Sequence, residues 1–175
     1  MRNFEKIKLI ILDVDGTLTD GGIYYDSQGN EIKRFDVKDG LGIKVAIESG
    51  IEFAIITGRE SSMVERRAKE LGISHVMTGI QKKYPAYLEL MAKLKLTSDE
   101  IGYIGDDLND WPVMNEIAYC ACPQDAAEQI KDICDFVAEK NGGHGAVREC
   151  IEFLLKQQNK WENNVEKLYN VYSIV

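Results

Sequence analysis

Two aspartates, Asp13 and Asp15, directly follow a short apolar run at 8–12 whose composition indicates a buried strand. A third, Asp106, follows a similar run at 101–104. Carboxylates that meet at the ends of buried strands repel one another unless a cation lies between them. Mg²⁺ prefers such oxygen ligands and is usually held by a few carboxylates together with substrate phosphate. The alternative is that both clusters are polar loops or helix caps, but their shared position at strand ends favours a magnesium site.

Other polar groups are expected at the same edge of the sheet. Thr57 follows the next apolar run, and a helix is predicted to begin at Lys82-Lys83. Open α/β sheets bind ligands at the carboxyl ends of their strands, so these side chains are candidates to act beside the metal. The only histidines are His75 and His144, far apart in the sequence. This argues against a histidine metal cage and makes a carboxylate the expected general acid or base.

An alternation of strands and helices must position these residues. Apolar runs and helical spacing predict strands at 8–12, 52–56, 75–77, 101–104, 118–121 and 136–137, and helices at 40–49, 61–71, 82–95, 108–115, 126–131 and 146–156. Single helices between strands imply a parallel sheet with right-handed crossovers. The expected fold is therefore a three-layer α/β/α sandwich in a single domain over 1–156. A β-hairpin is predicted at 21–36, and 157–175 is expected to form a tail.

Composition excludes several classes of protein. The chain has 175 residues, 45% apolar and 29% charged, which fits one domain with its own core. A formal net charge of −8, with no long run of basic residues, disfavours nucleic acid and membrane surfaces as partners. No apolar run near the N-terminus is long enough for a signal peptide or a membrane span, so a cytoplasmic protein is expected. The four cysteines include no CxxC pair and are expected to be packed free thiols.

Four segments together resemble the motifs of the haloacid dehalogenase-like phosphohydrolases. They are Asp13-Val14-Asp15-Gly16-Thr17, Thr57, Lys83 and Gly105-Asp106-Asp107-Leu108-Asn109-Asp110. The resemblance implies a Rossmann-like fold and a Mg²⁺ cofactor. It also implies that Asp13 is a nucleophile that forms an aspartyl-phosphate, and that Asp15 is the general acid and base. The implied metal ligands are the carboxylates of Asp13 and Asp106 and the backbone carbonyl of Asp15.

The resemblance also assigns the residues around the phosphate. Thr57 and the amides of Gly58 and Val14 would bind phosphoryl oxygens, and Lys83 would offset negative charge. Lys82 is expected to be solvated. Asn109 belongs to the implied substrate-binding set together with Asp15, Thr57, Gly58 and Lys83. Asp110, and with it Asp107, would orient Lys83 or a metal-bound water.

The spacing of the motifs leaves no room for the cap domain of larger relatives. Between Thr17 and Thr57 there is space for the hairpin and one helix, and between Lys83 and Asp106 for one helix and one strand. Desolvation strengthens the electrostatics of such a site, so the substrate or another subunit must close it. The hairpin carries four apolar side chains that look exposed, and we expect it to pack against copies of itself: Ile23, Tyr24, Tyr25 and Phe35.

Further segments resemble one capless subfamily, the phosphatases of 3-deoxy-D-manno-octulosonate 8-phosphate (KDO 8-phosphate). These segments are 19–22, 35–40, 64–68, 110–114 and 142–149. The resemblance implies a small sugar-acid phosphate as substrate, a role in lipopolysaccharide sugar synthesis, and a homotetramer with active sites at subunit interfaces. The alternatives are a phosphatase of a nine-carbon ulosonate (KDN or N-acetylneuraminate) 9-phosphate and a non-catalytic partner of a sugar nucleotidyltransferase. His144 stands where the subfamily most often has arginine.

A sugar-acid phosphate also needs a cation for its carboxylate. Arg59, beside Thr57, is the first candidate, because its planar guanidinium suits a carboxylate. In the subfamily an arginine there accompanies the eight-carbon substrate, and an acidic residue accompanies the nine-carbon one. Arg67 could reach a neighbouring subunit's site, whereas Arg66 is expected to be solvated. The aromatic tail either packs on its own core or docks near a neighbour's active site.

Overall fold

Six parallel strands form the central sheet of the computed structural model, which describes residues 4–170. Along the chain the strands are β1 (Leu9–Leu12), β4 (Glu52–Ile56), β5 (His75–Met77), β6 (Ile101–Ile104), β7 (Tyr119–Cys122) and β8 (Phe136–Val137). Their order in space is β5-β4-β1-β6-β7-β8. The chain therefore extends from β1 to one edge of the sheet, then returns to β6 and extends to the other edge. The point of reversal lies between β1 and β6, where doubly wound sheets bind their ligands.

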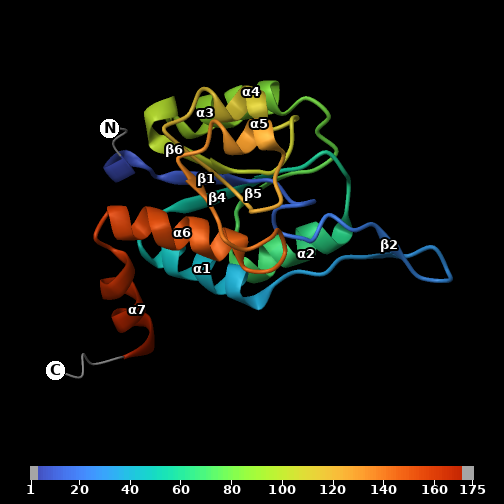
Figure 1. Ribbon diagram of the computed structural model, residues 1–175, viewed down its shortest axis with the longest axis horizontal. Coiled ribbons are helices and arrows are strands. Elements are labelled where there is room, and N and C mark those ends of the chain that lie inside the picture. Colours follow the sequence, from blue (N-terminus) through green and yellow to red (C-terminus); the bar gives the residue numbers. More distant parts are fainter. Residues whose placement is uncertain (1–3, 171–175) are drawn as a thin grey trace.

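Helices cover both faces of this sheet (Figure 1). On one face lie α1 (Val37–Glu48), α2 (Ser62–Leu71) and α6 (Ala146–Gln157), and on the other α3 (Lys83–Leu94), α4 (Trp111–Met114) and α5 (Glu128–Lys131). Alternate strand residues fill the two cores: Ile10 and Leu12 pack towards α1, and Leu9 and Ile11 towards α3. All four side chains of β1 are fully buried, as expected for a central parallel strand. The predicted three-layer sandwich is confirmed.

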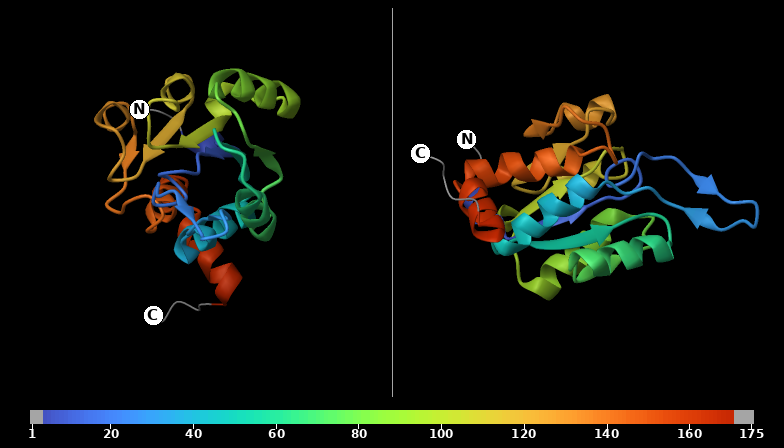
Figure 2. Two further views of the ribbon diagram at one scale, coloured as in Figure 1. Left: turned by 90° about the vertical axis from the view of Figure 1, so that its right-hand side faces the viewer. Right: turned by 90° about the horizontal axis from the view of Figure 1, so that it is seen from below.

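The predicted hairpin is also confirmed. It consists of β2 (Tyr24–Tyr25) and β3 (Glu31–Ile32) and projects well beyond the sandwich (Figures 1 and 2). The Asp26 carboxylate accepts hydrogen bonds from the amides of Gln28 and Asn30 and so closes the turn. In residues 4–170 a loop joins β1 to β2, and the later connections are single helices, with one 3₁₀ turn, η2 (Ser98–Glu100), before β6. None of these connections holds a cap domain.

Two predicted helix starts were wrong. α1 begins at Val37 rather than at 40, because the Asp36 side chain accepts a hydrogen bond from the Lys38 amide and caps the helix. Gly40 then lies inside the helix, where a Cβ atom would come within 2.4 Å of Arg67 on α2. α4 begins at Trp111 rather than at 108, because the preceding residues turn at the end of β6.

Part of the expected tail folds onto its own chain. The structure forms α7 (Trp161–Tyr169), which contacts α1 and α6. Trp161 is buried under the guanidinium of Arg148, which lies 4.5 Å from the ring centroid. α7 and the hairpin lie at opposite ends of the molecule (Figure 1), so this helix is remote from the site its own hairpin borders. The docking of the tail on a neighbour stays a prediction, and residues 171–175 lie outside the described residues.

Two further expectations concern the whole chain. The cysteines Cys120, Cys122, Cys134 and Cys150 are free thiols, and all except the half-buried Cys134 are buried. Among the described residues, every helix is too short or too polar to cross a bilayer. A short 3₁₀ turn, η1 (Phe4–Lys6), precedes β1 and places the ring of Phe4 edge-to-face against Tyr119.

One buried carboxylate joins the two long helices of the same face. Asp39 of α1 is almost fully buried, and its Oδ1 accepts a hydrogen bond of 2.8 Å from the amide of Arg148 at the start of α6. Within the described residues Oδ2 has no hydrogen-bond partner. Burial raises the pKa of Asp39 from 3.8 to about 6, and the favourable amides of α6 only partly offset this.

The stability of the protein should therefore fall as this group ionises. A folded-state pKa above the unfolded value means that the native protein binds more protons between about pH 4 and pH 6, so the free energy of unfolding decreases as pH rises through that window. The substitution Asp39→Asn mimics the protonated form. Relative to this variant, wild type should lose on the order of 2–3 kcal/mol between pH 4 and pH 7, measured by urea denaturation. Parallel stability curves for the two proteins would contradict the assignment.

Candidate active site

The predicted site residues meet at the carboxyl ends of the central strands. Asp13 follows β1, Thr57 follows β4 and Asp106 follows β6, while Lys83 is the first residue of α3. Because β4, β1 and β6 are neighbours in the sheet, their ends lie side by side. Thr57 is buried, and its amide donates to the carbonyl of Met77, which fixes the backbone at this point. The expectation that these strand ends converge is confirmed.

A buried lysine holds two of the carboxylates. Lys83 Nζ lies 2.6 Å from Asp13 Oδ1 and 2.6 Å from Asp110 Oδ1, and its side chain is 0% exposed. Burial alone would lower the pKa of Lys83, but the charges of Asp13 and Asp110 outweigh it and the pKa is raised. The hydroxyl of Tyr103, also buried, donates to Asp110 Oδ1 at 2.6 Å. The ammonium group is thus permanently charged and fixed against Asp13.

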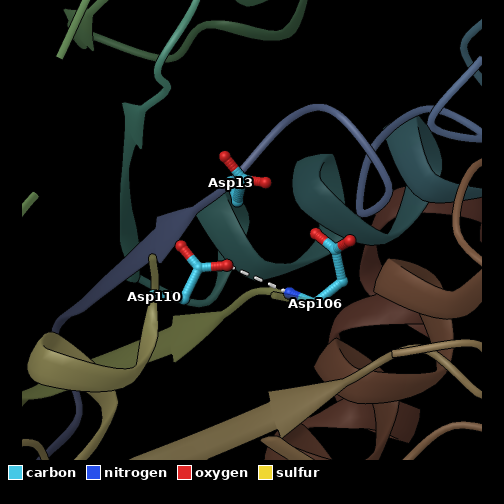
Figure 3. A group of neighbouring side chains, drawn as sticks. All are labelled: Asp13, Asp106 and Asp110. Carbon is cyan, nitrogen blue, oxygen red and sulfur yellow. Dashed lines mark hydrogen bonds between the residues drawn. The ribbon is translucent and has the colours of Figure 1, made fainter. Parts of the chain in front are cut away.

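Asp110 contacts the lysine that the sequence predicts it to orient. Both of its oxygens are already engaged: Oδ1 accepts from Lys83 and Tyr103, and Oδ2 accepts from the amides of Asp106 and Asp107. Figure 3 shows the hydrogen bond from the Asp106 amide. Single ligand atoms of Asp13, Asp106 and Asp110 all lie within 4.8 Å of one another, close enough to hold one metal ion. Since Asp110 is engaged on both oxygens, the carboxylates left for a cation are those of Asp13 and Asp106.

The electrostatics of these two carboxylates suit a divalent cation. Burial, followed by the negative charge of Asp110, raises the pKa of Asp13 to about 6, although Lys83 opposes the shift. Burial, followed by the charges of Asp13 and Asp110, raises the pKa of Asp106 to about 8. A divalent cation between Asp13 and Asp106 would remove this repulsion.

The loop after β1 is shaped to approach Asp106 closely. Thr17 Oγ1 donates to Asp106 Oδ1 at 2.9 Å. Gly16 has φ +93°, and a Cβ atom there would lie 2.0 Å from Asp106 Oδ2. Only glycine fits this position, because any side chain would displace the carboxylate.

Asp15 lies at the open side of the site. Its carboxylate is partly exposed and forms an ion pair with Lys33, which comes from the end of the hairpin. Its Oδ2 lies 3.9 Å from Arg59 Nε. Arg59 also donates to Glu31 and to the hydroxyl of Tyr25, at 3.2 Å each. The general acid and base expected from the motif is therefore next to the expected carboxylate-binding arginine.

The remaining candidates lie further from this group. Asn109 and Asp107 are exposed, and the Asp107 carboxylate accepts from the Leu108 amide, so only its backbone reaches Asp110. Arg67 pairs with Glu70 at 3.3 Å and lines a cavity of about 170 Å³ at the base of the hairpin. Within the described residues it forms no hydrogen bond or ion pair with Lys83 or its carboxylates, and its reach into a neighbour's site stays a prediction. Lys82 is exposed, as expected.

Sequence reasoning missed the hairpin's contribution to the site. Glu31, Lys33 and Tyr25 all reach Arg59 or Asp15, but their sequence read only as an exposed hairpin. The available signal was the alternation of Glu31-Ile32-Lys33, which puts both charges on one face. Tyr103 was missed because its strand shows only an apolar pattern.

Comparisons with known proteins agree with this geometry. The family model of haloacid dehalogenase-like hydrolases matches residues 10–81 and 75–151. The 3-deoxy-D-manno-octulosonate 8-phosphate phosphatase of Escherichia coli K12 is 46% identical over 89% of this chain and 83% of its own. A crystal structure of that phosphatase from Moraxella catarrhalis, in complex with magnesium, phosphate and KDO, superposes with a TM-score of 0.91 at 45% identity, covering 94% of this chain and 95% of that one. A cobalt-bound Haemophilus influenzae phosphatase superposes with a TM-score of 0.85 at 39% identity, over 90% and 92%.

Removing one of the repelling carboxylates should stabilise the metal-free protein and weaken its binding of Mg²⁺. In EDTA at pH 8, Asp106→Asn should melt several degrees above wild type, because about 1 kcal/mol changes the Tm by about 2–4 °C at this size. Mg²⁺ should raise the Tm of wild type but leave that of Asp106→Asn nearly unchanged. The exposed neighbour variant Asp107→Asn is the matched control and should respond to Mg²⁺ as wild type does. Equal Mg²⁺ shifts in all three proteins, measured by differential scanning fluorimetry, would exclude Asp106 as a ligand.

Proposed function

Because the chain belongs to the haloacid dehalogenase-like hydrolases, we propose that it is a magnesium-dependent phosphatase that releases phosphate from KDO 8-phosphate. The observation that carries the proposal is the Lys83 ammonium group fixed 2.6 Å from Asp13, beside Asp106 at the end of the next strand. Identity of 45–46% to KDO 8-phosphate phosphatases over about nine-tenths of the chain supports the substrate.

The first half of the reaction forms a covalent intermediate. An oxygen of Asp13 attacks phosphorus in line, and the bond between phosphorus and the C8 oxygen of the sugar breaks. Lys83 keeps Asp13 oriented and offsets the charge that gathers on the phosphoryl group, while Thr57 and nearby amides bind its oxygens. Asp15 gives its proton to the departing oxygen. Mg²⁺, held by Asp13, Asp106 and the Asp15 carbonyl, screens two anions from each other and stabilises the transition state.

The second half returns the enzyme to its starting state. Water attacks the aspartyl-phosphate, Asp15 takes a proton from that water, and the oxygen of Asp13 leaves phosphorus. One carboxylate serves both halves, because after giving its proton to the sugar oxygen it is ionised and can take a new proton from the attacking water. A position at the open side of the site suits this role, since both the sugar and the water arrive there.

Arg59 supports a substrate that carries a carboxylate. Its Nε is buried and has no hydrogen-bond partner among the described residues, although it lies near Asp15. Its Nη2 is held by Glu31 and Tyr25. A guanidinium fixed beside the general acid, with 39% of its side chain exposed, suits the anionic end of a sugar acid. A nine-carbon ulosonate 9-phosphate is the alternative substrate.

The same proposal includes the oligomeric state of the protein and its location in the cell. The hairpin exposes Ile23, Tyr24, Tyr25 and Ile32 on an arm without a packing layer of its own. Such an arm supports a homotetramer in which hairpins meet and neighbouring subunits border each active site. The enzyme would act in the cytoplasm, in lipopolysaccharide sugar synthesis, with no nucleic acid or membrane as partner.

A phosphate-release panel tests the function. Purified enzyme is given KDO 8-phosphate, a nine-carbon ulosonate 9-phosphate and an aryl phosphate, each with Mg²⁺ or EDTA. The highest kcat/KM should be found for KDO 8-phosphate with Mg²⁺. Asp13→Asn should lose at least about 10³-fold in kcat with an unchanged circular dichroism spectrum, because no covalent intermediate can form. Turnover within about tenfold of wild type in that variant, or Mg²⁺-independent turnover, would refute the proposal.

A charge reversal at Arg59 tests substrate discrimination. Arg59→Glu should lower kcat/KM for KDO 8-phosphate by about 10–100-fold, which is the loss expected for a charge-assisted hydrogen bond. The ratio of eight- to nine-carbon activity should shift towards the nine-carbon substrate. Arg66→Glu, on the exposed side of α2, serves as control and should keep the wild-type ratio. An Arg59→Glu enzyme with the original preference would remove Arg59 from substrate recognition.

A further inference from the structure

The hairpin has an outer apolar face and an inner charged face. Successive side chains of a strand point in opposite directions. Ile32 is 52% exposed, whereas the next side chain, Lys33, is only 4% exposed and that of Glu31 is 20% exposed. The arm that carries apolar residues outward thus carries two opposite charges inward.

Lys33 is a buried cation with two carboxylate partners. Its Nζ forms an ion pair with Asp15 Oδ1 and lies 3.5 Å from Glu31 Oε1. A lysine with so little exposure is held in place, because moving its charge away from both carboxylates would leave it desolvated and unpaired. Glu31 is itself anchored to the opposite side of the site, by Ser61 at 2.5 Å and Arg59 at 3.2 Å.

We propose that Lys33 is a positioning residue for the general acid and base, holding the carboxylate of Asp15 towards the leaving group and the attacking water. This inference rests on the proposed phosphatase reaction and deepens it. Lys83 fixes the nucleophile from inside the sandwich, and Lys33 fixes the general acid from the hairpin. Among residues 4–170 the Asp15 carboxylate makes no other short contact: Arg59 Nε, at 3.9 Å, is too distant to hold its orientation alone.

Burial separates this role from substrate binding. Only 4% of the Lys33 side chain is exposed, and its ammonium group is paired with Asp15 and Glu31. A substrate could bind this ammonium group only by displacing one of these carboxylates. Losing Lys33 should therefore change how well Asp15 transfers protons, not how tightly the substrate binds. A misplacement of about 1 Å in a catalytic group can cost about 10²-fold in rate.

The test compares Lys33→Met with wild type on two substrates. For KDO 8-phosphate, whose alkoxide leaving group needs a proton, kcat should fall about 10–100-fold with KM within about twofold. For 4-nitrophenyl phosphate, whose leaving group departs without a proton, the aspartyl-phosphate should form at a rate close to wild type. Its hydrolysis, which needs Asp15 as base, should be slow. Rapid-quench measurements should then show a burst of phosphoenzyme approaching one per active site.

Two further variants serve as controls for this comparison. Lys44→Met removes the same charge from the exposed face of α1 and should behave as wild type. Lys33→Arg keeps a cation beside Asp15 and should recover most of the lost kcat. If Lys33→Met does not fold, Lys33→Gln carries the same expectations for kcat, KM and the burst.

The outcomes are distinct. A rise in KM of more than about tenfold with kcat unchanged would make Lys33 a substrate contact and overturn the inference. Equal losses of kcat on both substrates, without a burst and with a lower Tm, would mean that Lys33 only anchors the hairpin. A wild-type enzyme that hydrolyses the aryl phosphate but not KDO 8-phosphate would refute the proposed substrate, while the burst comparison would still decide the role of Lys33.

Discussion

The rest of the site depends on one buried ammonium group, that of Lys83, shared between Asp13 and Asp110. Burying Asp13 as an ion costs free energy. The ion pair with Lys83 offsets this cost and engages only Oδ1 of Asp13. With Asp106 included, three carboxylates face one lysine, so the group stays negative and the pKa values of Asp13 and Asp106 are raised. A metal ion completes the neutralisation. The sheet topology brings these residues together, because β4, β1 and β6 are neighbours and their carboxyl ends lie side by side.

A second constraint is the close packing of two loops around the residues after β1. A Cβ atom on Gly142 would lie 1.8 Å from the carbonyl oxygen of Gly16, and the amide of Gly143 donates to the carbonyl of Thr17. The loop before α6 thus supports the loop after β1 from behind. His144 belongs to this support: its Nδ1 lies 2.8 Å from the carbonyl oxygen of Gly142 and its Nε2 lies 3.3 Å from Arg34. The departure from the subfamily's arginine therefore falls in the contact between loop and hairpin, not among the acidic residues.

The sequence predicted best where one physical rule acts alone. Apolar runs that stop at a charged residue located the strand ends, and a parallel arrangement then placed Asp13, Thr57 and Asp106 side by side. It failed where contacts from distant segments decide the outcome. The start of α1 depends on the cap at Asp36. The position of α7 depends on the contact between its Trp161 and Arg148 of α6. The inner face of the hairpin could not be inferred, because Lys33 on a polar strand looks solvated until Asp15 is seen opposite it.

The hairpin takes over part of what a cap domain does in larger relatives. A site without a cap is open to water, so specificity must come from groups already fixed at its border. Glu31 provides this fixation by holding Arg59, Ser61 and Lys33 at once. The cations beside Asp15 are therefore positioned before substrate arrives, and less ordering remains for binding to accomplish. The same arm turns Ile32 outward, so a partner bound on its outer face would also stiffen its inner face. If the proposed tetramer forms, its assembly and its catalysis would depend on the two faces of this hairpin.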